Sequence, residues 1–474
     1  MKKIISTTES ICPVCLRRIA AQRVAETDGI YMEKTCPEHG DFRVLLWRGS
    51  EQTYRNWERQ KQQPAEHYCH THVEKGCPYD CGFCEDHLQQ ICCVLLEVTQ
   101  RCNLHCPVCF ASAGGPSVDP TLEEIGRWYD ELMKAGGPFN IQLSGGEPTM
   151  RNDLADIIRL GKEKGFTYFQ LNTNGLRIAE EYDYLQELVQ AGLRNVFLQF
   201  DGLTEHPYEV LRGKPLLEKK KAAIENCRKA KVGLTLVPTV APGVNDNQVG
   251  DILNFSLEHM PVVRGVHFQP VSYFGRCDLE QNEQRITIPD MLHYMETQTG
   301  GIMKASDFLG GGAENSYCSF HGNFMRMPDG TIKSIKSDTT GCCCTSSKQS
   351  REFVAKRWSA APVLTTAQES SCCCGTAESA VRESSCCNGT ACAESQENTC
   401  CSSTPQPSLF DVFLERMENY TLAVSGMLFQ DAWNFDLERV KSCYLCEFSP
   451  QMKIVPFCAY NLSSISGETL YRGK

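Results

Sequence analysis

Three cysteines at C-x3-C-x2-C spacing stand out in the middle of the chain. Cys102, Cys106 and Cys109 lie in TQRCNLHCPVCFASAGG, directly after the apolar run VLLEV. Three thiolates on one short loop can hold three corners of a [4Fe–4S] cluster and leave one iron without a protein ligand. Catalytic metal sites keep such an open position, whereas structural sites are closed. We therefore expect a small molecule on the fourth iron, in preference to a zinc site completed by His105, because this is not a usual zinc-finger spacing.

The cysteine loop belongs to a region, residues 95–275, that alternates apolar strands with helical stretches. Several of the helical stretches end in glycine, a usual helix stop. Repeated βα units predict an α/β fold with a parallel sheet, curled by right-handed crossovers into a partial (βα)6 barrel. The six candidate strands are 94–99, 139–145, 168–175, 195–202, 233–240 and 265–271.

Polar residues follow five of these strands at the point where each strand ends. After the cysteine loop come SGGEPT (144–149), NTNG (172–175), DG (201–202) and PTVAPGVND (238–246). In parallel α/β folds the chemistry lies at the carboxyl ends of the strands. The pattern predicts that these segments meet at one face of the barrel.

RCNLHCPVCFA followed by SGGEPT resembles the radical S-adenosylmethionine (radical SAM) superfamily. The resemblance implies that Cys102, Cys106 and Cys109 ligate a [4Fe–4S] cluster whose open iron is chelated by the amino and carboxylate groups of S-adenosylmethionine (SAM). It implies that the reduced cluster splits SAM into methionine and a 5′-deoxyadenosyl radical, which abstracts hydrogen from an unactivated carbon. The electron would come from an external donor such as flavodoxin or ferredoxin.

The same resemblance assigns a set of cofactor-binding residues. Phe110 would lie near the adenine. The loop of Ser144, Gly145, Gly146 and Glu147 would meet the SAM amino group, with glycines that allow close approach and a carboxylate that can pair with an ammonium. Asn174, Asp201 and Thr239 are candidates for contacts to the ribose and carboxylate.

Cysteines before the barrel predict two further metal sites. One compact loop offers Cys77, Cys81, Cys84 and Cys92 (or Cys93), which is enough for a closed cluster. A second set is Cys12, Cys15 and Cys36 with Cys69 or His39, which fits a rubredoxin-like or zinc-ribbon site holding mononuclear Fe or Zn. Structural and electron-transfer roles both stay open for these sites.

Cysteines after the barrel predict an auxiliary iron–sulfur cluster. Cys443, Cys446 and Cys458 lie in CYLCEFSPQMKIVPFCAYN, and Cys318 is the candidate fourth ligand. The sequence thus predicts one or two auxiliary clusters beside the SAM-binding cluster.

These groups divide the chain into five parts. Residues 1–94 form a Cys-rich N-terminal metal-binding region and 95–275 the barrel. Residues 276–341 connect to the auxiliary-cluster region, 342–408 are a Cys-rich insertion, and 409–474 complete the auxiliary-cluster region.

The insertion contains 11 cysteines, many adjacent, and has no aromatic residue from 359 to 408. Such a composition cannot bury a core, so we expect disorder without a ligand: either a linker or a tether for thiophilic species such as Cu(I), Zn or trivalent arsenic.

The order of the cysteine motifs, from CPVC at residue 12 to PFCAYN at residue 456, resembles the tetraether lipid synthase group and the radical SAM (seleno)protein TrsS group. The first resemblance implies hydrogen abstraction from a lipid chain for C–C bond formation. The alternative is an enzyme of selenium or arsenic metabolism that uses the insertion to handle the element. A third hypothesis is a non-enzymatic metal carrier or electron-transfer protein.

Bulk composition sets the remaining expectations. The net charge of −11 over 474 residues argues against non-specific nucleic-acid binding. No window approaches 18 consecutive apolar residues, so no transmembrane helix is expected, although peripheral membrane contact stays open. MKKIISTTESICPVC has no apolar signal-peptide core, so we expect a cytoplasmic protein.

Overall fold

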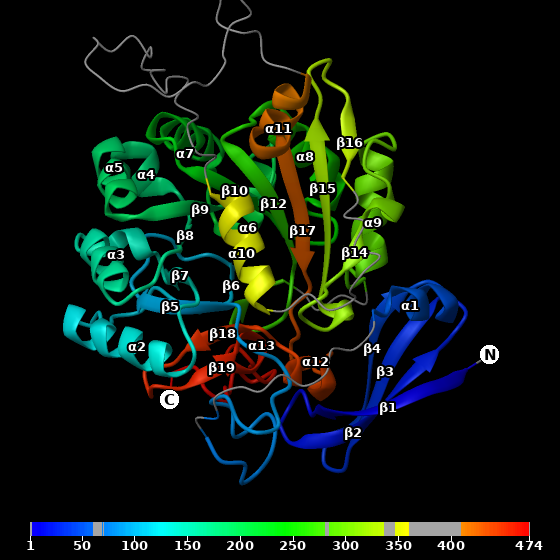
Figure 1. Ribbon diagram of the computed structural model, residues 1–474. Coiled ribbons are helices and arrows are strands. Elements are labelled where there is room, and N and C mark those ends of the chain that lie inside the picture. Colours follow the sequence, from blue (N-terminus) through cyan, green and yellow to red (C-terminus); the bar gives the residue numbers. More distant parts are fainter. Residues whose placement is uncertain are drawn as a thin grey trace, which may run out of the picture.

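The computed structural model describes residues 2–59, 69, 71–279, 284–335, 347–359 and 409–473 (Figure 1). Its centre is a 13-stranded sheet curled into an open barrel with helices outside, and a separate four-stranded sheet lies at the N-terminal end. The predicted α/β fold class is confirmed.

All six predicted strands are present, and each pairs in parallel with the next. They are β5 (Cys93–Thr99), β7 (Asn140–Gly145), β8 (Phe169–Thr173), β9 (Leu193–Gln199), β10 (Gly233–Val237) and β12 (Val263–Pro270), with the short β11 (Thr239–Val240) beside β12. Because the strands are parallel, their carboxyl ends meet at one face, as the sequence predicts.

The helices between these strands cover the outside of the sheet with apolar faces. In α2, Thr121 and Glu124 form a capping box at the N-terminus, and Ile125, Trp128 and Leu132 are buried at helical spacing. The helices of the barrel are α2 (Leu122–Lys134), α3 (Leu154–Glu163), α4 (Leu176–Glu180), α5 (Tyr182–Ala191), α6 (His206–Arg212), α7 (Leu217–Ala230) and α8 (Val249–Glu258).

Segments beyond the predicted barrel lengthen the same sheet at both edges. β17 (Thr421–Met427) pairs in parallel with β12, and β18 (Leu445–Phe448) pairs in parallel with β5. The C-terminal region therefore contributes directly to the barrel wall. The remaining elements around it are β6 (Val108–Cys109), β13 (Arg276–Cys277), α9 (Ile288–Gln298), β14 (Leu309–Gly310), β15 (Ser319–Arg326), β16 (Ile332–Ser334), α11 (Leu409–Asn419), α12 (Leu437–Lys441), β19 (Ile454–Pro456) and α13 (Phe457–Tyr460).

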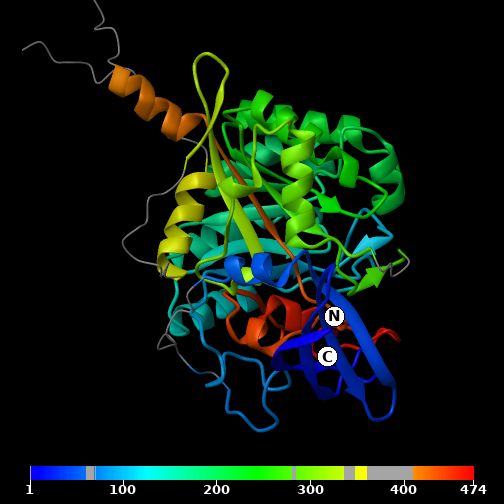
Figure 2. The same cartoon turned by 90° about the vertical axis from the view of Figure 1, so that its right-hand side faces the viewer.

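The N-terminal sheet contacts the C-terminal region (Figures 1 and 2). Its strands are β1 (Lys3–Ile11), β2 (Arg18–Ala25), β3 (Gly29–Cys36) and β4 (Gly40–Arg48), followed by α1 (Glu51–Trp57). Arg23 on β2 forms an ion pair of 2.6 Å with buried Asp436, and Phe42 packs edge-on against Trp433. These contacts hold the small sheet against the core.

One part of the insertion is structured, which corrects the expectation of disorder for 342–408. Residues Ser347–Trp358 form helix α10, which packs on β9, β10 and β12. Asn140 donates to the Arg351 carbonyl at 3.1 Å, and Asn195 donates to the Trp358 carbonyl at 2.8 Å. The segment SKQSREFVAKRW carries Val354 and Trp358, which are half-buried and face the barrel, whereas Phe353 is exposed. All 11 cysteines of the insertion lie outside the described residues.

Candidate active site and metal centres

A cavity of about 280 Å³ runs through the barrel from the cysteine loop. Its walls also include residues of β5, β7, β8, β9, β12, β17 and α10. The cavity brings together all the predicted cluster and cofactor residues except Asp201: Cys102, Cys106, Cys109, Phe110, Ser144, Gly145, Gly146, Glu147, Asn174 and Thr239.

Backbone contacts fix the cysteine loop at the rim of this cavity. β6, which contains Cys109, pairs with β13. Arg276 on β13 donates to the Cys106 carbonyl at 2.7 Å, and Arg212 donates to the Val108 carbonyl at 3.0 Å. Sequence reasoning missed both arginines, because no local motif marks a side chain that reaches a distant carbonyl.

Burial of these thiols fits a metal cluster. Burial raises the pKa of Cys102 to about 12 and also raises the pKa of Cys106. A buried thiolate needs a counter-charge, which a metal supplies on binding the sulfur. The three-sulfur set therefore suits a cluster with one open iron, although the ligand assignment itself stays a prediction.

Gly145 and Gly146 are required where two loops meet. A Cβ on Gly145 would lie 2.1 Å from the Thr99 carbonyl oxygen, and one on Gly146 would lie 2.3 Å from the Arg101 carbonyl oxygen. The amides of Gly146 and Glu147 donate to these same two carbonyls, at 2.8 Å each. The glycines thus let the strand end pack on the cysteine loop, a reason that differs from the predicted approach to a ligand.

The Glu147 carboxylate joins the ends of β7 and β8. It is buried and accepts from Thr149 N and Oγ1, from Thr173 Oγ1 at 2.7 Å and from Asn174 N at 2.7 Å. Its oxygens are therefore occupied by protein donors. The sequence did not indicate this role, and contact with the SAM amino group stays a prediction.

Asp201 lies behind the cavity wall and positions Arg212. Its two oxygens accept from Arg212 at 2.8 Å each, and Arg212 also donates to Thr239 Oγ1 at 2.8 Å. Both side chains are buried, but only Arg212 lines the cavity. Asp201 is therefore absent from the cavity lining, and its direct contact with the cofactor stays a prediction.

Lys220 is a second buried cation that sequence reasoning missed. Its ammonium donates to the Asn174 carbonyl at 2.6 Å and to Gln199 Oε1 at 3.0 Å. Burial lowers its pKa to about 8. The Lys220 ammonium thus holds the end of β8 at Asn174 in place.

The N-terminal sheet brings together four side chains that could hold a metal ion. The ligand atoms of Cys12, Cys15, Cys36 and His39 all lie within 4.8 Å of one another. Of the two candidates for the fourth ligand, the structure selects His39. Cys69, the alternative fourth ligand, is exposed and lies outside this group.

The loop at 77–93 divides between two places. Cys77, Cys81 and Cys84 line a small cavity together with Asp86 and His87. Cys92 and Cys93 line the barrel cavity instead, because β5 begins at Cys93. Cys92 and Cys93 are thus absent from the lining that Cys77, Cys81 and Cys84 share, and the fourth ligand of this site stays a prediction.

The C-terminal cysteines also separate. Cys318, Cys443 and Cys458 line one small cavity, whereas Cys446 lies in β18 and is absent from its lining. Arg439 donates to Cys318 Sγ at 3.3 Å, and the Gln430 amide donates to Cys458 Sγ at 3.3 Å. Cys446 is thus absent from this lining although it lies near Cys443, and the auxiliary cluster with its four predicted cysteines stays a prediction.

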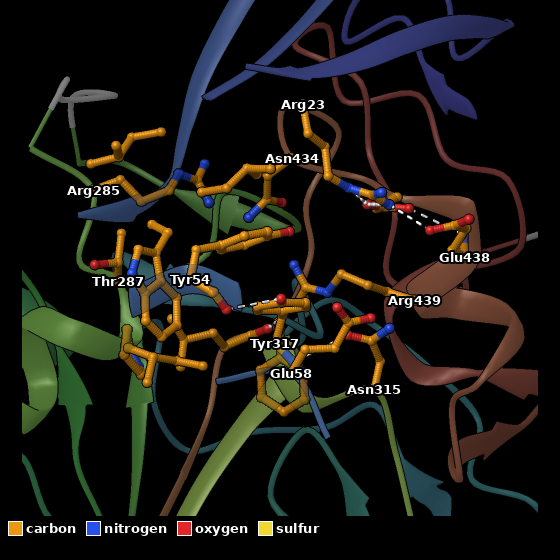
Figure 3. Close-up of a pocket in the computed structure, with 18 of the residues that line it drawn as sticks. Arg23, Tyr54, Glu58, Arg285, Thr287, Asn315, Tyr317, Asn434, Glu438 and Arg439 are labelled. Carbon is orange, nitrogen blue, oxygen red and sulfur yellow. Dashed lines mark hydrogen bonds and ion pairs between the residues drawn. The ribbon is translucent and has the colours of Figure 1, made fainter. Parts of the chain in front are cut away.

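A second cavity, of about 230 Å³, separates the N-terminal sheet from the core (Figure 3). Tyr54 and Tyr317 stack within it at 4.2 Å between ring centroids. Two arginines of its lining form ion pairs, Arg23 with Asp436 and Arg285 with Asp431. Among the described residues, no cysteine lines this outer cavity, so the barrel cavity is the candidate active site.

Comparison with known proteins identifies the class. Residues 96–256 match the Radical SAM superfamily, and residues 4–48 match the HMPTM N-terminal zinc ribbon domain. The chain is 35% identical over 471 residues to 7,8-dihydro-6-hydroxymethylpterin dimethyltransferase of Methanocaldococcus jannaschii, covering 96% of this chain and 93% of that protein. It is 28% identical over 234 residues to GTP 3′,8-cyclase of Limosilactobacillus fermentum, covering 47% of this chain and 67% of that protein. Streptococcus suis SuiB bound to its precursor peptide matches 46% of this chain and 47% of that chain, with 15% identity and a TM-score of 0.38.

The chain belongs to the radical SAM superfamily and shares a family with the M. jannaschii enzyme. It is therefore an enzyme, and the hypothesis of a non-enzymatic carrier is wrong. Membership implies a [4Fe–4S] cluster and SAM. Among the described residues, no helix is both long and apolar enough to cross a membrane.

Proposed function

We propose that this enzyme binds SAM at the Cys102–Cys106–Cys109 loop and abstracts hydrogen from a carbon of a substrate held in the barrel cavity. The observation that carries the proposal is the single cavity that these thiols share with Phe110, the 144–147 loop, Asn174 and Thr239. When bound, the cluster and SAM supply an electron and a 5′-deoxyadenosyl radical.

The chain's own residues position these groups and exclude water. Arg276 and Arg212 hold the cysteine loop, and Glu147 holds the strand ends beside it. Arg212, paired with Asp201, presents a guanidinium to the cavity that can bind a carboxylate. Apolar side chains such as Phe274, Phe429 and Phe457 line the remaining wall and keep solvent from the radical.

The first candidate substrate is a reduced pterin, with methylation as the outcome. The relative that matches 96% of this chain is named as a dimethyltransferase of 7,8-dihydro-6-hydroxymethylpterin, which is a different reaction from lipid C–C bond formation. This support moves the pterin ahead of the lipid chain that the sequence placed first.

The second candidate is a saturated lipid chain, which the apolar part of the cavity wall favours. Leu95, Leu104, Val108 and Met427 line the cavity together with the phenylalanines. The selenium or arsenic hypothesis depends on the cysteines of 342–408, which lie outside the described residues. An external electron donor, one or two auxiliary clusters and a cytoplasmic location complete the proposal.

The test is SAM cleavage by anaerobically reconstituted protein. With dithionite, the wild-type chain is expected to form 5′-deoxyadenosine, faster when the correct substrate is present. The triple variant Cys102→Ala, Cys106→Ala, Cys109→Ala should form none while keeping the metal of the N-terminal sheet. If that variant still forms 5′-deoxyadenosine, the site is assigned to the wrong cysteines.

A further inference from the structure

The end of the barrel cavity away from the cysteine loop has a different lining from its mouth. Residues alternate along each strand, so Tyr168, Gln170 and Asn172 of the β8 segment all face the cavity. Gln170 precedes Asn174 by four residues, or about 13 Å along a strand. The floor at this depth therefore lies well below the ring of cofactor residues.

Two polar atoms of this floor have no hydrogen-bond partner among the residues that the structure describes. Tyr168 is 3% exposed and Gln170 is 0% exposed. Within the described part of the chain, neither the Tyr168 hydroxyl nor Gln170 Oε1 has a hydrogen-bond partner. Gln170 is nevertheless held in place, because its Nε2 donates to Asn172 Oδ1 at 2.9 Å and Asn172 donates to Gln142 at 3.1 Å. Buried polar groups are nearly always paired, so these two atoms can take a hydrogen-bond partner from a ligand in the cavity.

Aromatic rings form one wall beside these polar atoms. Trp358 of α10 stacks on Phe197 at 5.7 Å between ring centroids, with 27° between the planes. His267 packs against both rings, and its Nδ1 lies 2.9 Å from Ser425 Oγ. Burial lowers the pKa of His267 to about 4, so at neutral pH the ring is uncharged. A flat, weakly polar surface thus stands next to an amide, a hydroxyl and an imidazole.

The described lining offers an ionic ligand no opposite charge at this depth. Among the described residues that line the cavity, the acidic and basic side chains are Glu147 and Arg212, both at the mouth. A glutamine amide pairs well with a heterocycle edge that places a donor beside an acceptor. Aromatic walls favour flat partners.

We infer that the floor of the barrel is a subsite for an uncharged, planar nitrogen heterocycle whose edge carries a donor beside an acceptor. The ring meets Gln170 and Tyr168 at its edge and the wall of Phe197 and Trp358. The inference rests on the proposed function, since it places the substrate in the same cavity as the SAM site. It also makes α10, a helix of the insertion, part of the substrate site.

The test is equilibrium binding to the full-length reconstituted chain without oxygen. The probes are 7,8-dihydro-6-hydroxymethylpterin, guanosine and, as the hydrocarbon alternative, palmitate. Gln170→Leu and Trp358→Ala should each weaken heterocycle binding by about tenfold or more, since a bidentate contact or a stacked ring contributes this much. Gln52→Leu, the same change at an exposed amide of α1, should leave binding unchanged.

Several results would overturn the inference. They are saturable binding of palmitate with no binding of either heterocycle, no saturable binding of any probe, and heterocycle binding that ignores both substitutions. A separate assay of SAM cleavage in the absence of substrate tests the proposed function independently of the heterocycle subsite. If the wild type binds a heterocycle but never cleaves SAM, the proposed chemistry fails while the subsite stands.

Thermal unfolding gives a second readout. Tyr168→Phe removes an unpartnered hydroxyl, so the Tm of the ligand-free chain should stay level or rise. Tyr129→Phe is the matched control, because the Tyr129 hydroxyl donates to the Ile157 carbonyl at 3.3 Å and its loss should lower the Tm. An equal fall in both variants would show that Tyr168 has a structural partner, which contradicts the subsite.

Discussion

At the scale of residues, the active-site cavity depends on buried charges that hold one another in place. Asp201 and Arg212 are joined by two hydrogen bonds of 2.8 Å and are both buried. Removing one member of such a pair leaves the other charge without compensation. Loss of either Asp201 or Arg212 should therefore lower the free energy of unfolding as well as the activity.

Asp201→Asn should lower the free energy of unfolding by roughly 3 kcal/mol, because it breaks a buried ion pair. Glu187→Gln is the control, since its pair with Arg159 is exposed on both sides and contributes about 0–1 kcal/mol. Urea unfolding of both variants measures the difference. Equal losses would show that burial does not strengthen the Asp201–Arg212 pair.

Gly146→Ala should disrupt the packing of the 144–147 loop on the cysteine loop, because the new Cβ would lie 2.3 Å from the Arg101 carbonyl oxygen. We expect the rate of 5′-deoxyadenosine formation to fall on the order of a hundredfold, as for a misplaced catalytic group. Gly115→Ala, where nothing lies within 4 Å, should keep the wild-type rate. A wild-type rate in both variants would refute the role of this contact.

At the scale of elements, the N-terminal sheet brings two turns together to make a metal site. The CPVC turn follows β1 and the CPEHG turn joins β3 to β4, so pairing of the strands places Cys12, Cys15, Cys36 and His39 side by side. Metal affinity therefore depends on the fold of this sheet.

His39→Ala should lower the zinc or iron bound by the N-terminal site, whereas Cys69→Ala should leave it unchanged. Metal analysis of the purified variants measures this directly. Retention of metal in His39→Ala together with loss in Cys69→Ala would restore the alternative ligand set.

The sequence predicts those features that are encoded by neighbouring residues and misses those that depend on contacts between distant segments. The six barrel strands carry continuous apolar runs that end in polar motifs, and all six are present. The sequence did not predict that β17 and β18 join the barrel sheet. They pair with strands more than 150 residues earlier, and no local pattern encodes that register. Likewise, the spacing of Cys92 suggested a metal ligand. In the structure, Cys92 directly precedes β5 and lines the barrel cavity. Helix α10 was not predicted, because the composition of the surrounding Cys-rich segment was used to interpret 342–408 as a whole.

At the scale of the whole molecule, the C-terminal segment completes the barrel from both sides. β17 covers the edge at β12, and β18 covers the edge at β5. An uncovered central strand exposes backbone groups and apolar side chains.

Truncation after residue 408 should therefore give an insoluble chain, because both barrel edges lose their neighbours. Replacement of 360–408 by a flexible Gly/Ser linker should leave SAM cleavage within about twofold of wild type, because α10 keeps its contacts with the barrel. Soluble yield and 5′-deoxyadenosine formation measure the two effects. A soluble, active truncation would contradict the role of β17 and β18.

The central claim is that three thiolates leave one iron open for SAM. The most direct measurement is the electron paramagnetic resonance spectrum of the dithionite-reduced chain before and after SAM is added. A reduced [4Fe–4S] signal should change when SAM binds, and this SAM-sensitive signal should be absent from the Cys102, Cys106, Cys109 triple alanine variant. A spectrum that does not respond to SAM, or one that responds equally in the variant, would contradict the claim.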